Sequence, residues 1–186
     1  MIFRSTETSM KQQWGRRWAG SMGWTLAGAM LLAGCTVTRP LQLQADAVLL
    51  PTHRGHARGT VSLVERADGV QVTYSLSGLP PGTNHALHIH EWGDCNALDA
   101  SSAGPIFNPD AQRLRRGARP DGDLGTIRAD VNGVATGFLV ARNLTLDGIN
   151  SVTGRAVVLH RDDDLDDSAP DQGAGPALAC GVLHAF

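Results

Sequence analysis

Short runs of alternating apolar and polar residues make up much of the sequence beyond residue 58. The clearest runs, 59–66 and 70–76, flank Asp68-Gly69, and alternation on both sides of an Asp-Gly pair predicts a β-hairpin. Successive side chains of a strand point to opposite faces, so such runs bury one face of a sheet. The 22 glycines and the single lysine also favour an all-β domain over a helical bundle.

The remaining runs complete an all-β pattern. A second hairpin is predicted where the runs 125–129 and 134–140 flank Asn132-Gly133. The runs 85–91, 155–160 and 180–185 are further strands, and about eight short strands are expected in a chain of 186 residues, a length that suits one domain. Strands at this spacing predict an eight-stranded Greek-key β-barrel or sandwich.

Two segments between the expected strands are longer than a simple connection requires. They cover residues 92–124 and 161–179. Ordered loops of this length usually carry function. We therefore expect functional residues in these two loops or beside them.

The first 34 residues have the features of an export signal. Basic residues precede an apolar run, 18–34, that is too short to span a bilayer securely. The run ends Leu32-Ala33-Gly34-Cys35, which resembles the bacterial lipobox, where the signal is removed before a cysteine that then carries lipid. The alternative is a plain secretory signal with an incidental cysteine. We expect three parts: a signal peptide at 1–34, a lipidated Cys35 with its tether at 35–45, and the folded domain at 46–186.

Export and charge limit the partners of the domain. An exported protein with a lipid on Cys35 is expected in the periplasm or cell envelope, held at the outer membrane by that lipid alone. A start at Met10 instead of Met1 gives a leader of more ordinary length. The formal net charge is −2 and no block of basic residues persists, so nucleic-acid binding has no electrostatic basis.

The other two cysteines, Cys95 and Cys180, form an even pair in an oxidising compartment. A bridge between them would stabilise the fold by roughly 4–5 kcal/mol in the chain-entropy model. The alternative is two buried thiols or a pair of metal ligands.

Three histidines carry the chemistry that the sequence predicts. His88 and His90 are two residues apart in an expected strand, so both imidazoles can reach one ion while Leu87 and Ile89 face the core. A third histidine, His160, ends the run 156–159. Taken alone, each is as well explained by a solvated strand face or a strand end.

The surroundings of these histidines resemble a known family. The segment HALHIHEWGDC, residues 85–95, resembles the copper-ligand strand of copper–zinc superoxide dismutases. The resemblance covers roughly residues 45–184, because four more segments match that family in order and spacing: SAGPIFNP (102–109), GDLG (122–125), VVLH (157–160) and LACGV (178–182).

That resemblance implies a fold, a cofactor and roles for particular residues. It implies an eight-stranded Greek-key barrel with a disulfide between Cys95 and Cys180. It also implies one copper ion, through which catalysis takes place, with ligands at His88, His90 and His160. His85 matches a residue that supports the site and is not itself a ligand.

Several residues that the family uses are missing. The histidine that copper and zinc share falls at Ile106, and the two further zinc histidines are absent from 113–120. The zinc aspartate survives as Asp123, but one carboxylate cannot make a tetrahedral zinc site. We therefore expect copper without zinc, and Asp123 as a loop-capping residue. The family's active-site arginine falls at Ala177.

Two functions compete on this basis. The first is a copper-dependent superoxide dismutase, an antioxidant oxidoreductase that converts superoxide to oxygen and hydrogen peroxide. Its activity is expected to be reduced, because Ile106 cannot deliver a proton and Ala177 cannot attract an anion. The second is a non-catalytic lipoprotein that buffers or delivers copper. A structural domain without metal requires all three histidines to be kept by accident. The four arginines in 113–119 form either a solvated loop or a substitute for the missing arginine.

Overall fold

The alternating runs form an antiparallel β structure, which confirms the predicted all-β class. The computed structural model describes residues 42–109, 119–163 and 174–186. These ranges contain nine strands and one 3-10 turn, η1 (Ser101–Ala103). The strands are β1 (Gln44–Pro51), β2 (Arg58–Arg66), β3 (Gly69–Ser77), β4 (Asn84–His90), β5 (Asp123–Arg128), β6 (Ala135–Ala141), β7 (Ala156–His160), β8 (Ala177–Val182) and β9 (His184–Ala185).

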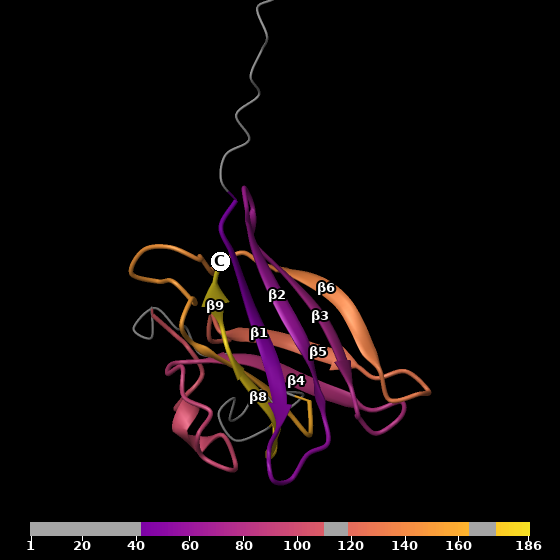
Figure 1. Ribbon diagram of the computed structural model, residues 1–186. Coiled ribbons are helices and arrows are strands. Elements are labelled where there is room, and N and C mark those ends of the chain that lie inside the picture. Colours follow the sequence, from indigo (N-terminus) through magenta and orange to yellow (C-terminus); the bar gives the residue numbers. More distant parts are fainter. Residues whose placement is uncertain (1–41, 110–118, 164–173) are drawn as a thin grey trace, which may run out of the picture. The chain divides into compact units, whose positions relative to one another are not determined.

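The strands make a nearly closed Greek-key barrel (Figure 1). Hydrogen-bonded neighbours follow the order β5-β4-β7-β8-β1-β2-β3-β6, and the two-residue β9 pairs with β1. β1 belongs to both halves, since its first part pairs with β2 whereas Leu50 and Pro51 at its end pair with β8. The outermost strands, β5 and β6, contact each other and bring the two ends of the order together. The eight-stranded barrel is therefore confirmed, with β9 as a short addition.

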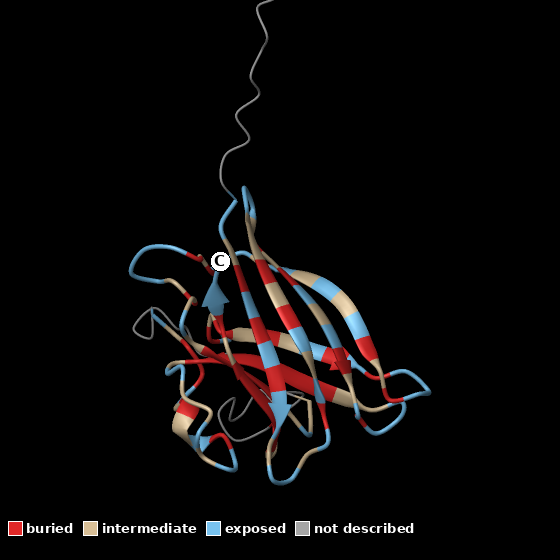
Figure 2. Ribbon diagram, viewed as in Figure 1, coloured by how far each residue is buried: buried red, intermediate tan, exposed pale blue. Residues whose placement is uncertain are grey.

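The core lies inside this barrel, where one face of each strand is apolar. Along β2, for example, Val61 and Leu63 are buried in the core, whereas Thr60, on the opposite face of the strand, is exposed. β4 differs, because all six of its residues from His85 to His90 are buried (Figure 2). The period of two places Leu87 and Ile89 in the core and leaves the intervening histidines on the opposite face. That outer face is buried because the long loops cover it.

The first predicted hairpin is confirmed as β2 and β3. Its register pairs Arg66 with Gly69. The two-residue turn is therefore Ala67-Asp68, one position earlier than the Asp68-Gly69 pair that indicated it.

The second predicted hairpin is wrong, although its turn forms. The Asp130 carboxylate accepts hydrogen bonds from the N–H groups of Asn132 and Val134, which stabilises the reversal. The flanking strands do not pair with each other: β5 pairs with β4, and β6 pairs with β3. An Asn-Gly turn determines a local reversal, but each strand's partner is decided by tertiary contacts.

Some predicted segments lie outside the described residues. They are the leader, Cys35, most of the tether, and Arg113, Arg115 and Arg116. β1 begins at Gln44, so the last two residues of the expected tether are already part of the sheet. Among the described residues, we find no helix with the length and apolar character needed to cross a membrane.

Candidate metal centre

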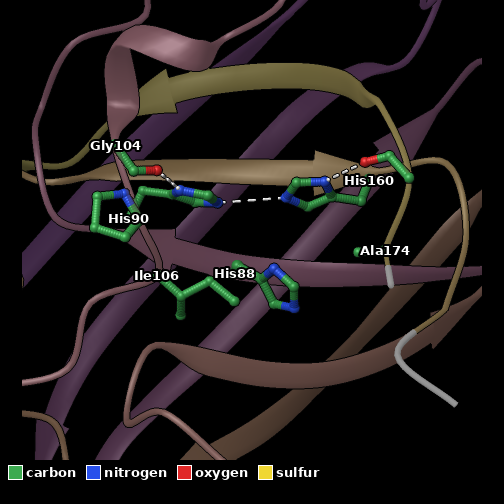
Figure 3. Close-up of a pocket in the computed structure, with 8 residues that line it drawn as sticks. His88, His90, Gly104, Ile106, His160 and Ala174 are labelled. Atoms are coloured by element: carbon green, nitrogen blue, oxygen red, sulfur yellow. Dashed lines mark hydrogen bonds between the residues drawn. The ribbon is translucent and has the colours of Figure 1, made fainter. Parts of the chain in front are cut away.

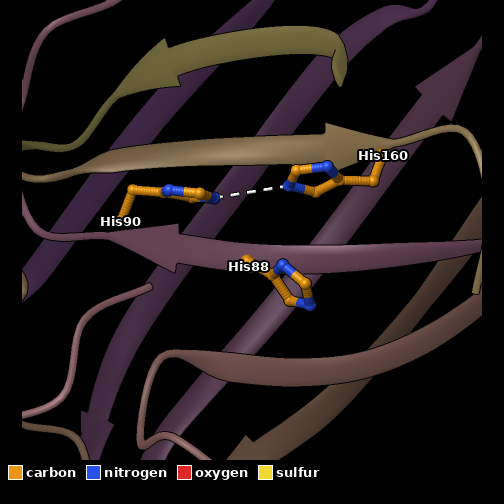
Figure 4. Close-up of side chains that lie close together, drawn as sticks. All are labelled: His88, His90 and His160. Carbon is orange, nitrogen blue, oxygen red and sulfur yellow. Dashed lines mark hydrogen bonds between the residues drawn. The ribbon is translucent and has the colours of Figure 1, made fainter. Parts of the chain in front are cut away.

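Three histidines converge beside the paired strands β4 and β7. β4 carries His88 and His90 on its outer face, and β7 ends at His160. One ring nitrogen of each lies within 4.8 Å of the other two (Figure 4). The structure thus brings together all three candidate ligands from the sequence.

Backbone carbonyls orient two of the three rings. Nδ1 of His90 lies 2.6 Å from the Gly104 carbonyl oxygen, and Nδ1 of His160 lies 3.0 Å from that of Gly175 (Figure 3). A carbonyl can only accept a hydrogen bond, so each Nδ1 carries a proton. Histidine ligands of metals commonly use their second N–H in this way. In the neutral rings, Nε2 of both residues therefore holds the lone pair.

The two orienting carbonyls come from the two long loops that the sequence marked as functional. Gly104 has φ +76° and Gly175 has φ +68°, a region that side chains disfavour. At Gly104 a Cβ atom would also overlap the ring of Trp92. Loop glycines thus allow the backbone to approach the imidazoles in the required direction.

The arrangement of nitrogens fits a bound cation. Nε2 of His90 lies 3.3 Å from Nε2 of His160, and two lone pairs at that distance repel unless positive charge lies between them. Nε2 of His88 faces Asp123, whereas its other nitrogen, Nδ1, faces the two rings (Figure 4). Three imidazole nitrogens suit Cu(I), and Cu(II) can add water. The donor set therefore fits copper.

The space next to the histidines is a small pocket. Ile106 is only 7% exposed and lines one side of this pocket (Figure 3). Its backbone forms an isolated β-bridge with His90. Apart from the three histidines, the described residues that line the pocket are uncharged: Gly104, Pro105, Ile106, Ala174 and Gly175.

His85 lies next to the site but outside the histidine cluster. It is fully buried, and its Nδ1 donates a hydrogen bond to the backbone carbonyl of His160 at 3.0 Å. Its Nε2 is hydrogen-bonded to the hydroxyl of Thr83 at 2.6 Å. These contacts tie the end of β7 to the start of β4, and so hold the backbone that carries His160.

Asp123, at the start of β5, has more contacts than a loop cap. Its Oδ1 accepts a hydrogen bond from the Gly125 N–H at 2.7 Å, which is the capping contact expected from the sequence. The same oxygen lies 3.8 Å from Nε2 of His88, and Oδ2 lies 3.3 Å from Nη1 of Arg119. Arg119 is the member of the 113–119 arginines that the structure describes.

A second arginine near the pocket is already paired. Arg161 donates hydrogen bonds to both carboxylate oxygens of Asp162, at 2.7 to 3.1 Å. These bonds hold the pKa of Asp162 below its usual value and raise the pKa of Arg161. The pair is therefore close to neutral as seen by an approaching anion. Ala177 pairs with His160 in the sheet and is itself buried.

Cys95 and Cys180 form the disulfide that the resemblance implied. Their Cα atoms are 5.8 Å apart, and 85 positions separate them in the sequence. The bond joins the first long loop to β8, and small buried residues such as Ala100 and Ala103 pack around Cys180. The alternative of two free thiols is wrong.

The sequence analysis missed the two orienting glycines. Gly104-Pro105 and Gly175-Pro176 are the two Gly-Pro pairs of the chain, and this dipeptide signals an irregular turn. One occurs in each long loop, so the pairs were the available signal. The contact of Asp123 with His88 and Arg119 had no such signal, because it joins residues of different elements.

Comparisons with known proteins agree with this geometry. The family model for copper/zinc superoxide dismutase (SODC) matches residues 57–183. The chain is 41% identical over 138 residues to a Cu-Zn superoxide dismutase of Yarrowia lipolytica, a match that covers 67% of this chain and 88% of that protein. For the Candida glabrata protein of the same name, identity is 38% over 135 residues, with 67% and 86% covered. For that of Saccharomyces cerevisiae it is 40% over 123 residues, with 60% and 78% covered. The chain belongs to the copper/zinc superoxide dismutase family.

Proposed function

We propose that the protein is a copper-dependent superoxide dismutase whose turnover is lower than that of a family member with all its site residues. Two superoxide anions and two protons yield one oxygen and one hydrogen peroxide. The observation that carries the proposal is the convergence of His88, His90 and His160 within 4.8 Å. Membership of the family supports the same activity.

The residues around the histidines account for the lower turnover. Bound copper supplies a one-electron couple, so that one superoxide is oxidised and a second is reduced. Reduction to hydrogen peroxide needs two protons, and Ile106 offers none, so they come from solvent in the pocket. Arg161 adds little attraction for the anion, because Asp162 balances its charge.

We further propose that the protein holds copper without zinc. A structural zinc ion needs four ligands in a tetrahedral arrangement. Of the residues that bind zinc in the family, this sequence keeps only the aspartate, Asp123. The guanidinium of Arg119 lies beside the carboxylate of Asp123. Among the described residues, the three copper histidines are the one group of three candidate ligands.

A non-catalytic role in copper binding or delivery is the second candidate. The observation that favours it is the uncharged wall that the described part of the chain gives the pocket, formed by Ile106, Ala174 and their neighbours. Such a wall leaves the three nitrogens able to hold copper, but it provides neither a proton carrier nor a positive charge for superoxide.

Metal analysis of the purified protein beside a superoxide assay tests these proposals. We expect about one copper and little zinc per chain, and measurable turnover well below the diffusion limit. His160→Ala is expected to lose the copper, whereas His184→Ala, an exposed histidine on β9, is the matched control and should keep it. Stoichiometric zinc retained against a weak chelator would contradict the copper-only site. Tight copper binding without turnover would instead support the copper-handling role.

We propose that the domain is exported and held at the cell envelope by a lipid on Cys35. The support is the sequence Leu32-Ala33-Gly34-Cys35 after a short apolar run. The wild-type protein is expected to enter the detergent phase on partitioning, whereas Cys35→Ser is expected to remain in the aqueous phase because no lipid can be attached. Equal partitioning of the two proteins would show that the lipobox interpretation is wrong.

A further inference from the structure

One end of the barrel carries exposed apolar side chains, and it is the end at which β1 begins. Leu43, just before β1, is 39% exposed, and Phe186, just after β9, is 77% exposed. The N–H of Phe186 donates a hydrogen bond to the carbonyl of Gln44 at 3.4 Å. Phe186 therefore lies beside the start of β1, close to Leu43.

The loop after β6 brings a third apolar side chain to this end. Ile149, in that loop, is 93% exposed. The N–H of Leu146 donates a hydrogen bond to the carboxylate of Glu65 at 2.6 Å, and the N–H of Glu65 donates one to the carbonyl of Leu43 at 2.9 Å. The loop is thus fastened beside Leu43, at the end of the barrel where β2 turns into β3 (Figure 1). We call Leu43, Ile149 and Phe186 the apolar end.

The charges around the apolar end do not favour a strongly charged partner. Arg66 and Arg142 are exposed on the two sides of Gly69, and the exposed carboxylates of Asp68 and Asp147 balance them. Recognition at this end therefore depends on apolar area. A lipid surface provides such recognition, because apolar side chains can enter the boundary between headgroups and acyl chains.

The tether limits how far this end can move from a lipid on Cys35. Six residues, 36–41, separate Cys35 from Gln42, so the backbone between these two residues spans at most about 25 Å. Docking of the anchored domain is then an intramolecular step, for which a short linker gives an effective concentration of the order of millimolar. A patch too small to bind a membrane from solution can therefore stay docked.

We propose that the apolar end is a membrane-docking surface, whose three side chains enter the boundary between the headgroups and acyl chains of the bilayer. The occupant is the bilayer that holds the lipid of Cys35, and the inference rests on that proposed anchor. Docking gives the domain one direction relative to the membrane, which a lipid on a tether alone does not.

This direction keeps the metal centre away from the lipid. β1 starts at the docked end, and Pro51 at its other end pairs with Ala179 of β8. Ala177, where β8 begins, pairs with His160 of the metal centre. The candidate copper ligands therefore lie towards the end of the barrel that faces solvent, where superoxide and copper reach the pocket.

A fluorescent probe tests the docking in the lipidated protein. With lipid on Cys35 and the other two cysteines in a disulfide, the thiol introduced by Ile149→Cys can be labelled selectively with a nitrobenzoxadiazole fluorophore. In vesicles of phosphatidylethanolamine and phosphatidylglycerol, we expect a doxyl-labelled lipid to quench most of the emission. The matched control is Val131→Cys, which is 84% exposed in the turn before β6 at the opposite end and should remain unquenched.

A charge added to the apolar end tests insertion separately. With the probe on Phe186→Cys, Ile149→Asp should remove most of the quenching, because an ionised carboxylate is costly to move from water into lipid. Val131→Asp in the same background should leave the quenching unchanged. The three native side chains are exposed, so these variants are expected to fold, and thermal melting followed by circular dichroism checks this.

The outcomes separate the docking from the anchor. If the protein partitions into detergent through Cys35 but the Ile149→Cys probe is unquenched, or is quenched no more than the Val131→Cys probe, the docking alone is wrong. If Cys35→Ser partitions like the wild type, the anchor is wrong; an unquenched Ile149→Cys probe then overturns the docking too, whereas a quenched one supports it. Probe emission that changes with protein concentration in the absence of vesicles shows that a second copy covers the apolar end, and overturns lipid docking.

Discussion

Replacing both Cys95 and Cys180 with alanine should lower the free energy of unfolding by about 2–5 kcal/mol. The bond closes a loop of 85 positions, so its loss greatly enlarges the number of conformations of the unfolded chain. Urea unfolding of the metal-free protein measures the difference. Alanine is smaller than a half-cystine, so it takes both places without a clash.

The same change should also weaken copper binding. Cys95 anchors the loop that later supplies Gly104, whose carbonyl orients His90. Cys35→Ser is the control, since it removes a cysteine without touching this bond, and its stability should equal that of the wild type. Reaction of both Cys95 and Cys180 with a thiol reagent in the unfolded, unreduced protein would show that the bond is absent.

The sequence predicted which histidines lie together better than it predicted the strand connections. The pair His88 and His90 could be placed on one face because a strand has a period of two, and the opposite residues Leu87 and Ile89 did enter the core. The disulfide, by contrast, was predicted from the even number of cysteines and from the resemblance to a family, and that resemblance alone favoured His160 as a ligand over an ordinary residue at a strand end. Local periodicity says which face a residue occupies, but not which distant strand lies beside it.

The errors and omissions have the same physical origin. The turn at Asn132-Gly133 formed, yet its strands found other partners, because closing the barrel determines the pairing. The contact of Arg119 with Asp123 depends on the path of a loop, and the carbonyls of Gly104 and Gly175 depend on two left-handed residues. Each involves a backbone direction or a loop path that hydrophobic patterning does not encode.

Ala177→Arg should raise superoxide turnover at low ionic strength by about tenfold or more, within the 10–10³ range of electrostatic steering. Ala177 pairs with His160 in the sheet, so an arginine there would place a positive charge beside the metal centre. The charge of the neighbouring Arg161 is already balanced by Asp162 and adds little attraction for superoxide. Ala177→Gln adds a long polar side chain without charge and is the control for crowding, because Ala177 is buried. An equal gain with glutamine would contradict an electrostatic cause.

Ionic strength and pH distinguish this gain from that of a restored proton carrier. The Debye length falls from about 10 Å at 0.1 M salt to about 3 Å at 1 M, so the advantage of Ala177→Arg should largely disappear at high salt. Ile106→His places an imidazole in the pocket, and its gain should persist in salt but decline as the pH rises through its ordinary pKa of about 6.5. The protonated form that delivers the proton is lost over that range. A wild-type protein already at the diffusion limit would contradict the argument from both positions, and the arginines of 113–119 would then be the residues to replace.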